Sequence, residues 1–319
     1  MSEVGRSRML SQLHIDAARN STDDFNPFHD PHKWRRIDAN PFGGPIALGF
    51  QLETLAVHRV EWHHRQNGED ARARTAGLGF GNFDYGFADV IRPGEAFELV
   101  VRPTNDRIRE RGELSNRVTI RSGRRLVMLG HQRETAVPLV HGEADFTHLG
   151  DLSRAPDRSL VGEGLFLKRK FMNTSNAKNF LLGSLVDQYH YFDELEDRVC
   201  FPTLFPVALI SCALLEKALA GGYDFYRRPM VYTAHQVTVD RALQAQLKSN
   251  DRLHILVRGP EPVPGRKGLG KSDIPQQMHH CFGLVEGNRI LFRARVAMAL
   301  LQDVVQACGA RTERRAVTA

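Results

Sequence analysis

The chain has 319 residues, of which 42% are hydrophobic and 25% are charged, a composition that is ordinary for a globular protein of about two domains. The N-terminus lacks the apolar stretch of a secretory signal, and no apolar run reaches the roughly 20 residues of a bilayer span. We therefore expect a cytoplasmic protein that is neither secreted nor embedded in a membrane.

The formal net charge is +6, which fits an anionic partner such as the phosphates of coenzyme A or an acidic carrier protein. A solvated basic surface without a partner is the alternative interpretation of the same charge. No zinc-finger, RNA-binding or basic-zipper signature is present, so no nucleic-acid partner is expected.

The first unusual segment is DDFNPFHDP, residues 23–31, in which an acid, an amide, a proline and a histidine follow within a few positions. Pro27 pushes the preceding Asn26 out of the helical region, so a bend, and not a helical turn, brings Asp24 close to His29. A carboxylate beside an imidazole fixes the imidazole tautomer and suits acid/base catalysis. Because Asp and Asn are also common turn residues, a purely structural loop is the alternative.

The next segment, NPFGGPIALGF at residues 40–50, leads into an apolar stretch that predicts a buried helix with Pro45 in its first turn. The first turn of a helix carries unpaired N–H groups and a positive dipole end, and small residues there let a carbonyl group approach the backbone. A proton-transfer pair next to such a helix end is what reversible hydration of an α,β-unsaturated thioester requires. A plain helix start is the alternative for this segment.

The chain repeats its order of elements once. The helical segment that begins at Gly44 has a counterpart that begins at Phe205, and each contains a proline before an almost wholly apolar stretch. Two further pairs of segments share the pattern of strands and glycine turns, namely 92–103 with 249–260, and 118–129 with 283–294. Each half is therefore predicted to contain one buried helix followed by several antiparallel strands.

A buried helix wrapped by a long antiparallel sheet is the hot-dog arrangement, and two such units in tandem predict an α+β double hot-dog fold. The polar, turn-rich stretch between the two halves is interpreted as a linker. The predicted division is a first hot-dog domain at 1–139, a linker at 140–159, a second hot-dog domain at 160–310 and a basic tail at 311–319.

Residues 14–50, HIDAARNSTDDFNPFHDP…GGPIALGF, resemble the signature of MaoC-like dehydratases and (R)-specific enoyl-CoA hydratases. In that family a helix with small residues leads into D-F-N-P-x-H and then, after about 15 to 20 residues, into G-P-I-x-H-G and the hot-dog helix. The D-F-N-P-x-H part matches completely. The resemblance implies that Asp24 and His29 are the catalytic pair that activates water, and that Asn26 supports them.

The resemblance also implies where the substrate lies. A backbone N–H near Gly49 would bind the thioester carbonyl, and Gly44, Pro45 and Leu48 would contribute to substrate binding. The implied enzyme is a lyase that reversibly hydrates a 2-enoyl thioester, or dehydrates a 3-hydroxyacyl thioester, of coenzyme A or acyl carrier protein. The resemblance implies no metal and no separate cofactor, and it leaves a homodimer open.

Two positions depart from the family pattern. The histidine of G-P-I-x-H-G is Leu48 here, and the acid that usually lies two residues after the catalytic histidine directly follows it as Asp30. These departures favour an alternative in which the chain binds acyl thioesters without catalysis, or is a partner subunit of a biosynthetic complex. Hydrolysis of the thioester on the same fold is a further alternative.

The second half is predicted to be degenerate. Its segment SLVDQYHYFDE, residues 184–194, carries Asp187 and His190 only three positions apart, and bulky residues replace the glycines before its helix. We therefore expect one active site per chain, in the first half, with the second half shaping the acyl channel. The segment GRKGLGKS at 265–272 matches the P-loop pattern, but Pro275 interrupts the helix that a P-loop requires, so no nucleotide site is expected.

Overall fold

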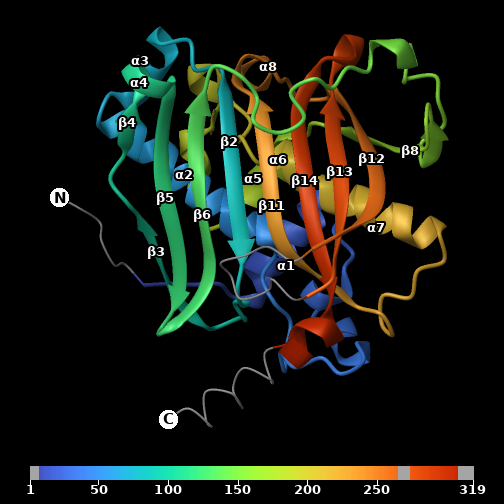
Figure 1. Ribbon diagram of the computed structural model, residues 1–319. Helices are drawn as coiled ribbons and strands as arrows, with labels where there is room; N and C mark the ends of the chain where they lie inside the picture. Colours follow the sequence, from blue (N-terminus) through green and yellow to red (C-terminus); the bar gives the residue numbers. More distant parts are fainter. Residues whose placement is uncertain (1–6, 265–273, 308–319) are drawn as a thin grey trace.

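The computed structural model describes residues 7–264 and 274–307 of the chain. The first half contains β1 (Arg8–Met9), α1 (Gln12–Thr22), α2 (Gly49–Gln66), α3 (Glu69–Thr75), β2 (Phe80–Phe87), β3 (Ala96–Val101), β4 (Asn105–Arg107), α4 (Ile108–Arg111), β5 (Glu113–Ser122) and β6 (Arg125–Thr135). The second half contains β7 (Ser159–Val161), β8 (Leu165–Phe171), α5 (Thr174–Gly183), β9 (Phe192–Asp193), β10 (Arg198–Val199), α6 (Phe205–Ala208), α7 (Ile210–Ala220), β11 (Met230–Asp240), α8 (Arg241–Ala245), β12 (Arg252–Val263), β13 (Gln276–Leu284) and β14 (Ile290–Leu300). In Figure 1 the strands form one broad sheet in front, and α2, α5 and α7 lie behind it.

Twelve of the described strands form one sheet, whose order is β1-β3-β5-β6-β2-β11-β14-β13-β12-β8-β7, with β4 paired to β5. The two halves meet at β2 and β11, which pair antiparallel from Ala234↔Gly86 to Asp240↔Phe80. The strand order is mirrored about this pair, with β6, β5 and β3 on one side and β14, β13 and β12 on the other. The predicted double hot-dog fold and its internal repeat are thereby confirmed, because each repeated strand occupies the matching place in its half.

The two central helices, α2 and the broken pair α6 and α7, are buried against the sheet. Helix α2 buries Phe50, Leu52 and Leu55, and every residue of α6 is buried. A single hydrophobic core contains residues from both halves, including Phe83 of β2 and Val237 of β11. The halves therefore share one core, and their division into two domains stays a prediction.

The predicted place of Pro45 in the first turn of a buried helix is wrong. Helix α2 begins at Gly49, and the stretch before it is not helical. The N–H groups of Ile46 and Ala47 donate to carbonyl oxygens of neighbouring segments, which hold this stretch beside them and delay the start of the helix. In the second half Pro206 does lie in the first turn of α6, as predicted.

The predicted linker is attached to the second half by a small core of its own. Its residues Phe146 and Leu152 are buried and pack with Leu256 and Phe282 of the sheet. The linker crosses the upper part of the sheet in Figure 1 before it reaches β7. Apolar contacts therefore fix a segment that is polar in most of its sequence.

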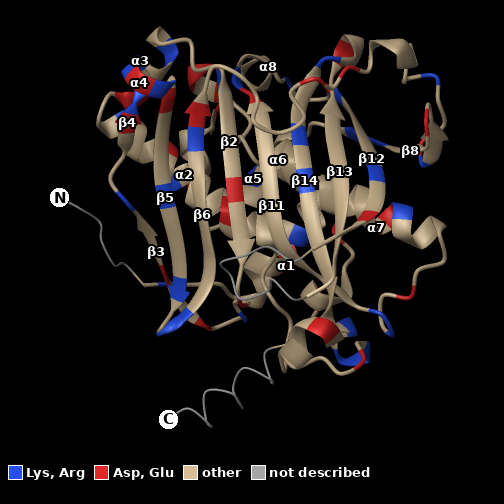
Figure 2. Ribbon diagram, viewed as in Figure 1, with Lys and Arg blue, Asp and Glu red and all other residues tan. Residues whose placement is uncertain are grey.

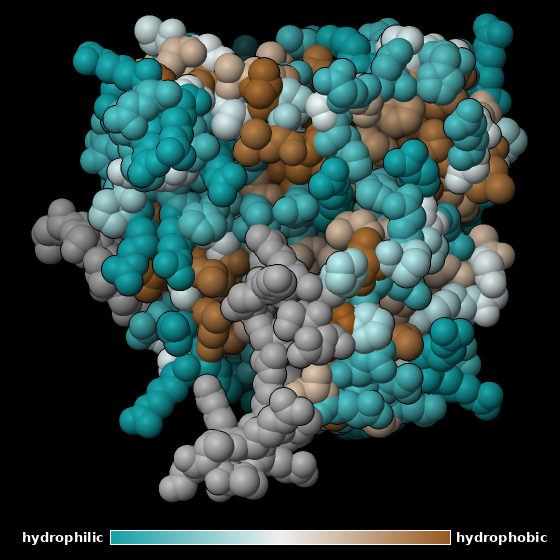
Figure 3. Space-filling view, viewed as in Figure 1, coloured by the Kyte–Doolittle hydropathy of each residue, from teal (hydrophilic) through white to brown (hydrophobic). Residues whose placement is uncertain are grey.

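Basic and acidic residues lie close to one another along the ribbon in Figure 2. In the same orientation, Figure 3 shows apolar surface in separate areas between hydrophilic residues. The basic residues in this view are spread over several elements of both halves. None of the described helices is long and apolar enough to cross a bilayer.

Candidate active site

The predicted acid/histidine segment forms a tight turn between α1 and a short 3₁₀ helix, η1 (Pro27–His29). The Asp24 carboxylate accepts a hydrogen bond from the N–H of Asn26 at 3.0 Å. The side-chain oxygen of Asn26 accepts one from the N–H of Phe28 at 3.2 Å, which caps η1. Asn26 therefore fixes the turn that separates the acid from the histidine.

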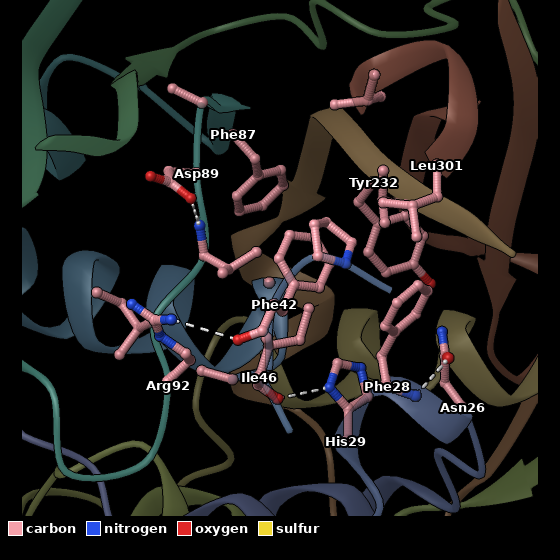
Figure 4. A pocket seen from close by; sticks show the side chains of 18 of the residues that line it. Asn26, Phe28, His29, Phe42, Ile46, Phe87, Asp89, Arg92, Tyr232 and Leu301 are labelled. Carbon is pink, nitrogen blue, oxygen red and sulfur yellow. Dashed lines mark hydrogen bonds between the residues drawn. The ribbon is translucent and has the colours of Figure 1, made fainter. Parts of the chain in front are cut away.

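This turn brings the Asp24 carboxylate and the His29 imidazole together. Nδ1 of His29 lies 2.8 Å from the carbonyl oxygen of Ile46 (Figure 4), and because a carbonyl only accepts, Nδ1 carries the proton. In the neutral form of this imidazole Nε2 bears the lone pair, and it lies 3.9 Å from Oδ2 of Asp24. Both side chains are buried. The predicted pair is thus assembled in space, and its catalytic role stays a prediction.

Gly49 is the first residue of α2 and lines a cavity that His29 also lines. Its N–H has no acceptor within the helix, and the preceding Leu48 has no side-chain oxygen to cap the first turn. A Cβ on Gly49 would lie 2.9 Å from Cζ of Phe87, so a larger residue would displace the phenyl ring. The helix start therefore offers donor N–H groups close to His29.

Gln51 anchors this helix start and was not predicted from the sequence. Its Oε1 accepts a hydrogen bond from the N–H of Leu48 at 3.2 Å, and its Nε2 donates to the carbonyl oxygens of His14 and Gly183. The side chain is buried and joins α2 to α1 and α5. The only available signal was a polar residue in an apolar first turn, which is common at helix starts.

The cavity beside His29 has a volume of about 440 Å³ and draws on both halves of the chain. Its apolar wall includes Phe28, Phe42, Phe87, Ile91, Met230 and Leu301. Three of the predicted site residues line it, namely Asn26, His29 and Gly49. Asp24 is not part of the wall and meets the cavity through its contact with His29.

The predicted substrate contacts before α2 are displaced by one or two positions. Gly44, Pro45 and Leu48 are not part of the cavity wall, whereas Ile46 and Ala47 are. The side chain of Leu48 is instead buried in the hydrophobic core, away from the cavity. Ile46 and Ala47 are therefore the better candidates for substrate contact.

A second cavity, of about 370 Å³, adjoins the first. The two cavities share five wall residues, namely Asn26, Phe28, Met230, Tyr232 and Met298. Helix α7 of the second half supplies much of the remaining wall through Leu214, Leu215 and Ala218. A ligand that passes Phe28 and Tyr232 would therefore enter a largely apolar space.

Tyr232 is a polar group of the wall that was not predicted from the sequence. Its hydroxyl lies 3.1 Å from Oγ of Ser211. Burial, together with the charge of Asp24, raises the pKa of Tyr232 well above its usual range, so the phenol keeps its proton. Figure 4 shows its ring near those of Phe28 and Phe42. A neutral hydroxyl thus lies close to the acid/histidine pair.

Asp30, one of the two departures from the family pattern, has structural contacts. Its Oδ1 accepts hydrogen bonds from the N–H groups of His32 and Lys33, each at 2.9 Å, and its Oδ2 lies 3.1 Å from Nη1 of Arg19. Burial raises the pKa of Asp30, but the two backbone hydrogen bonds and Arg19 outweigh burial and lower it overall. Asp30 therefore stays ionised and fixes the chain after His29.

The equivalent turn of the second half joins α5 to η4 (Gln188–His190). Oδ1 of Asp187 accepts a hydrogen bond from the N–H of Tyr189 at 2.9 Å, which is the capping contact that Asn26 makes in the first turn. Asp187 is exposed. The structural counterpart of Asp187 is therefore Asn26 and not the acid Asp24.

The turns after α1 and α5 can be aligned on a residue with left-handed backbone that lies just after each helix. Asp23 has φ 54° after α1, and Leu185 has φ 57° after α5. The following residue is Asp24 in the first turn and Val186 in the second, and Val186 is buried. The second turn thus has an apolar side chain where the first has its acid, which supports the prediction of one site per chain.

Neither a protein-family model nor a curated protein matches the chain. Among solved structures, a protein named MaoC-like dehydratase matches with a TM-score of 0.52 and 10% identity, over 94% of this chain and 96% of that chain. A Mycobacterium tuberculosis protein, described as a conserved hypothetical protein essential for bacterial survival during infection with a double hotdog fold, matches with a TM-score of 0.53 and 12% identity, over 94% and 96%. This chain has the double hot-dog fold.

A protein from Chloroflexus aurantiacus that is described as a MaoC domain protein dehydratase matches with a TM-score of 0.54 and 8% identity over 93% of each chain. At such low identities the likeness establishes the fold. It agrees with the resemblance of residues 14–50 to the MaoC-like signature.

The P-loop-like segment 265–272 and the basic tail 311–319 lie outside the described residues. The described chain after the first of these segments enters strand β13 at Gln276. A P-loop continues into a helix, whereas the described residues after this segment form a strand.

Proposed function

We propose that the protein catalyses the reversible hydration of 2-enoyl thioesters and the reverse dehydration of 3-hydroxyacyl thioesters. The observation that carries the proposal is the geometry of His29, whose Nδ1 is bound to the carbonyl of Ile46 and whose Nε2 lies 3.9 Å from the Asp24 carboxylate beside an apolar cavity. The helix start at Gly49 lines the same cavity, as polarisation of a thioester carbonyl requires. The double hot-dog fold, shared with proteins named MaoC-like dehydratases, supports the proposal.

The acid/histidine pair would hold and activate the water molecule. The lone pair on Nε2 of His29 and the charge of the Asp24 carboxylate repel one another unless a proton donor lies between them. A water molecule at about 2.8 Å from both atoms fits their separation and donates one hydrogen to each. The lone pairs of its oxygen then remain free to attack C3 of the enoyl group.

The helix start would stabilise the charge that develops on the substrate. The thioester carbonyl accepts a hydrogen bond from the N–H of Gly49, and the positive end of the helix dipole favours the enolate oxygen. The water oxygen bonds to C3, the C2=C3 electron pair moves into the enolate, and a proton passes to Nε2 of His29. Nε2 of His29 then returns this proton to C2, which restores the thioester and the neutral imidazole, and dehydration is the reverse sequence.

We place the acyl chain beyond C3 in the second cavity. Gly49 and His29 belong to the wall of the first cavity, whereas Asn26 and Phe28 belong to both walls. A substrate with its carbonyl at Gly49 and its C3 at His29 therefore continues past Phe28 toward α7. In this proposal the second half has lost its own site and shapes the acyl channel.

The thioester carrier in this proposal is coenzyme A or acyl carrier protein, in the cytoplasm. Both carriers are anionic, which suits a chain with a net charge of +6. The arginines of the cavity wall are already engaged, since Arg92 donates to the carbonyl of Phe42 at 3.3 Å and Arg125 pairs with Asp89 and Glu95. These two side chains therefore stabilise the wall itself.

The test is incubation of the purified protein with 2-enoyl-CoA thioesters of increasing chain length. Hydration removes the conjugated enoyl absorbance and leaves the thioester intact, so thiol release is followed in parallel. We expect loss of absorbance without free thiol, and no loss with His29→Ala. Thiol release would identify a thioesterase, and binding without turnover would identify a binding protein, and either result would contradict the proposal.

A further inference from the structure

A second acid/histidine pair lies in the core, apart from the pair described above. Nδ1 of His235 on β11 lies 2.9 Å from Oε1 of Glu53 on α2. Both residues are 0% exposed, so the pair is removed from solvent and joins the two halves of the molecule. Titratable groups are costly to bury, and the mechanism proposed above uses neither Glu53 nor His235.

His235 lies against the wall of the first cavity. Its ring stacks on Phe50 with 4.4 Å between centroids and meets the rings of Phe87 and Tyr232 edge-on at 5.0 and 4.6 Å. Phe87 and Tyr232 both line the cavity. Cε1 of His235 lies 3.5 Å from the position that a Cβ on Gly49 would take. The imidazole therefore lies next to the helix start where the thioester carbonyl is proposed to bind.

The hydrogen bond to Glu53 fixes the orientation of this imidazole. Nδ1 is directed to the carboxylate, and the neighbouring Cε1 is the ring atom that approaches Gly49. Nε2 of His235 and Oε2 of Glu53 have no hydrogen-bond partner among the described residues. Burial raises the pKa of Glu53, and the charge of His235 opposes that shift. Nδ1 of His235 therefore bonds to Glu53, and the adjacent Cε1 is directed to the start of α2 at Gly49.

The family signature has a histidine directly before this glycine, where the present chain has the buried Leu48. His235 brings an imidazole to the same helix start from the other half of the molecule. We propose that His235, oriented by Glu53, is a positioning residue that polarises the thioester carbonyl bound at Gly49.

The physical reason is electrostatic. An imidazole that shares a proton with a carboxylate carries positive charge on its ring hydrogens, and in a buried, largely apolar site this charge favours the enolate oxygen over the ground-state carbonyl. The identity of the ligand rests on the proposed function, whereas the polarisation of a bound carbonyl can be measured without turnover.

A conjugated 2,4-dienoyl-CoA is a suitable probe, because its absorption moves to longer wavelength when its carbonyl oxygen is polarised. The host protein is Asp24→Asn, in which hydration of the probe is suppressed. We expect a red shift of the bound probe in this host, and loss of more than half of the shift when His235→Gln is added. Glu53→Gln keeps the imidazole and is expected to remove less of the shift.

His58→Gln is the matched control, because His58 is a buried histidine as well. It lies on α2, 3.1 Å from the Tyr191 hydroxyl. It lies nine positions after Gly49, about 13 Å along the helix, and its loss should leave the red shift unchanged. Both histidine variants are expected to lower the melting temperature, so stability alone does not distinguish them.

Kinetics with Asp24 intact provide a second readout. His235→Gln is expected to lower kcat about tenfold and to change KM by less than about twofold, as loss of transition-state stabilisation requires. The proposal is overturned if the probe shows no red shift in the host, or if His235→Gln keeps the full shift. If the wild-type protein hydrates no thioester but the red shift of the bound probe depends on His235, the proposed function is contradicted. The proposal that His235 polarises a carbonyl bound at Gly49 is then still supported.

Discussion

The turns that follow α1 and α5 have the same backbone plan and different chemistry. In each, a left-handed residue follows the helix, a side-chain oxygen caps a short 3₁₀ helix, and a histidine lies three positions after the cap. In the first turn Asp24 faces His29 at 3.9 Å. In the second turn the corresponding acid is absent, and His190 lies beside the ring of Trp62 at 4.7 Å.

The comparison shows that the fold of a turn and its capacity for proton transfer depend on different residues. The cap and the left-handed residue maintain the bend in both halves. Proton transfer requires in addition a carboxylate next to the imidazole, and the second turn holds Val186 at that position. A duplicated fold can therefore keep one site and use the other half as a wall.

Removal of the first pair is expected to have the largest effect. Asp24→Asn and His29→Ala should each lower kcat for enoyl hydration about 10³-fold, because general acid–base catalysis contributes about 10²- to 10⁴-fold. Asp187→Asn, in the equivalent turn, should change kcat by less than about twofold. Initial rates with one short 2-enoyl-CoA check all three variants. A similar loss of kcat for the variants in both turns would contradict the inference that only the first turn transfers protons.

Obstruction of the second cavity tests the role given to the second half. Ala218→Trp should lower kcat/KM for long-chain 2-enoyl-CoA about 100-fold and should spare short chains, because the indole occupies the space proposed for the acyl tail. Ala220→Trp, at an exposed position of the same helix, is the matched control. An equal loss for short and long chains would show that the acyl chain does not enter this cavity.

The packing of the two helices that precede the turns can be tested through stability. A Cβ on Gly183 would lie 2.7 Å from the backbone N of Ala18 and from the carbonyl oxygen of His14. Gly183→Ala should therefore destabilise the protein by about 2–3 kcal/mol through overpacking. Gly142→Ala, whose Cβ would make only ordinary contacts, should cost less than about 1 kcal/mol. Chemical denaturation measures both, and equal stabilities would contradict close packing of α1 on α5.

The smallest expected effect concerns Asp30, which follows the first histidine and is replaced by Tyr191 in the second turn. Its pKa is lowered from 3.8, so its charge stabilises the folded state above the unfolded-state pKa, and this stabilisation is lost as pH falls through the lowered value. Asp30→Asn should cost about 1 kcal/mol at neutral pH, as loss of a capping carboxylate does. Chemical denaturation at pH 7 and at about pH 3 should show that the difference in unfolding free energy between Asp30→Asn and wild type is smaller at the lower pH. The same difference at both pH values would contradict stabilisation by the ionised Asp30 carboxylate.

The first turn could be predicted from the sequence because its determinants are contiguous. Pro27 and Asn26 set the bend through local rules, and Asp24 and His29 lie at its two ends. The double hot-dog fold could be predicted for a similar reason, since the apolar helices and the alternating strands recur in the same order in each half.

Contacts between distant segments could not be predicted. Glu53 and His235 are 182 positions apart, and they meet where α2 of the first half packs against β11 of the second half. The start of α2 was misplaced because its preceding residues bond to other segments. The counterpart of Asp24 in the second turn could not be located by spacing, because Phe25 gives the first turn one residue more than the second turn has.

The most direct test of the central claim follows the oxygen atom of water. The wild-type protein and His29→Ala are each incubated with a 2-enoyl-CoA in water labelled with heavy oxygen, and the products are analysed by mass spectrometry. We predict that wild type forms a 3-hydroxyacyl-CoA with one labelled oxygen on C3 and an intact thioester, and that His29→Ala forms none. Label in a released carboxylic acid, or no incorporation by wild type, would contradict activation of water by Asp24 and His29 for hydration.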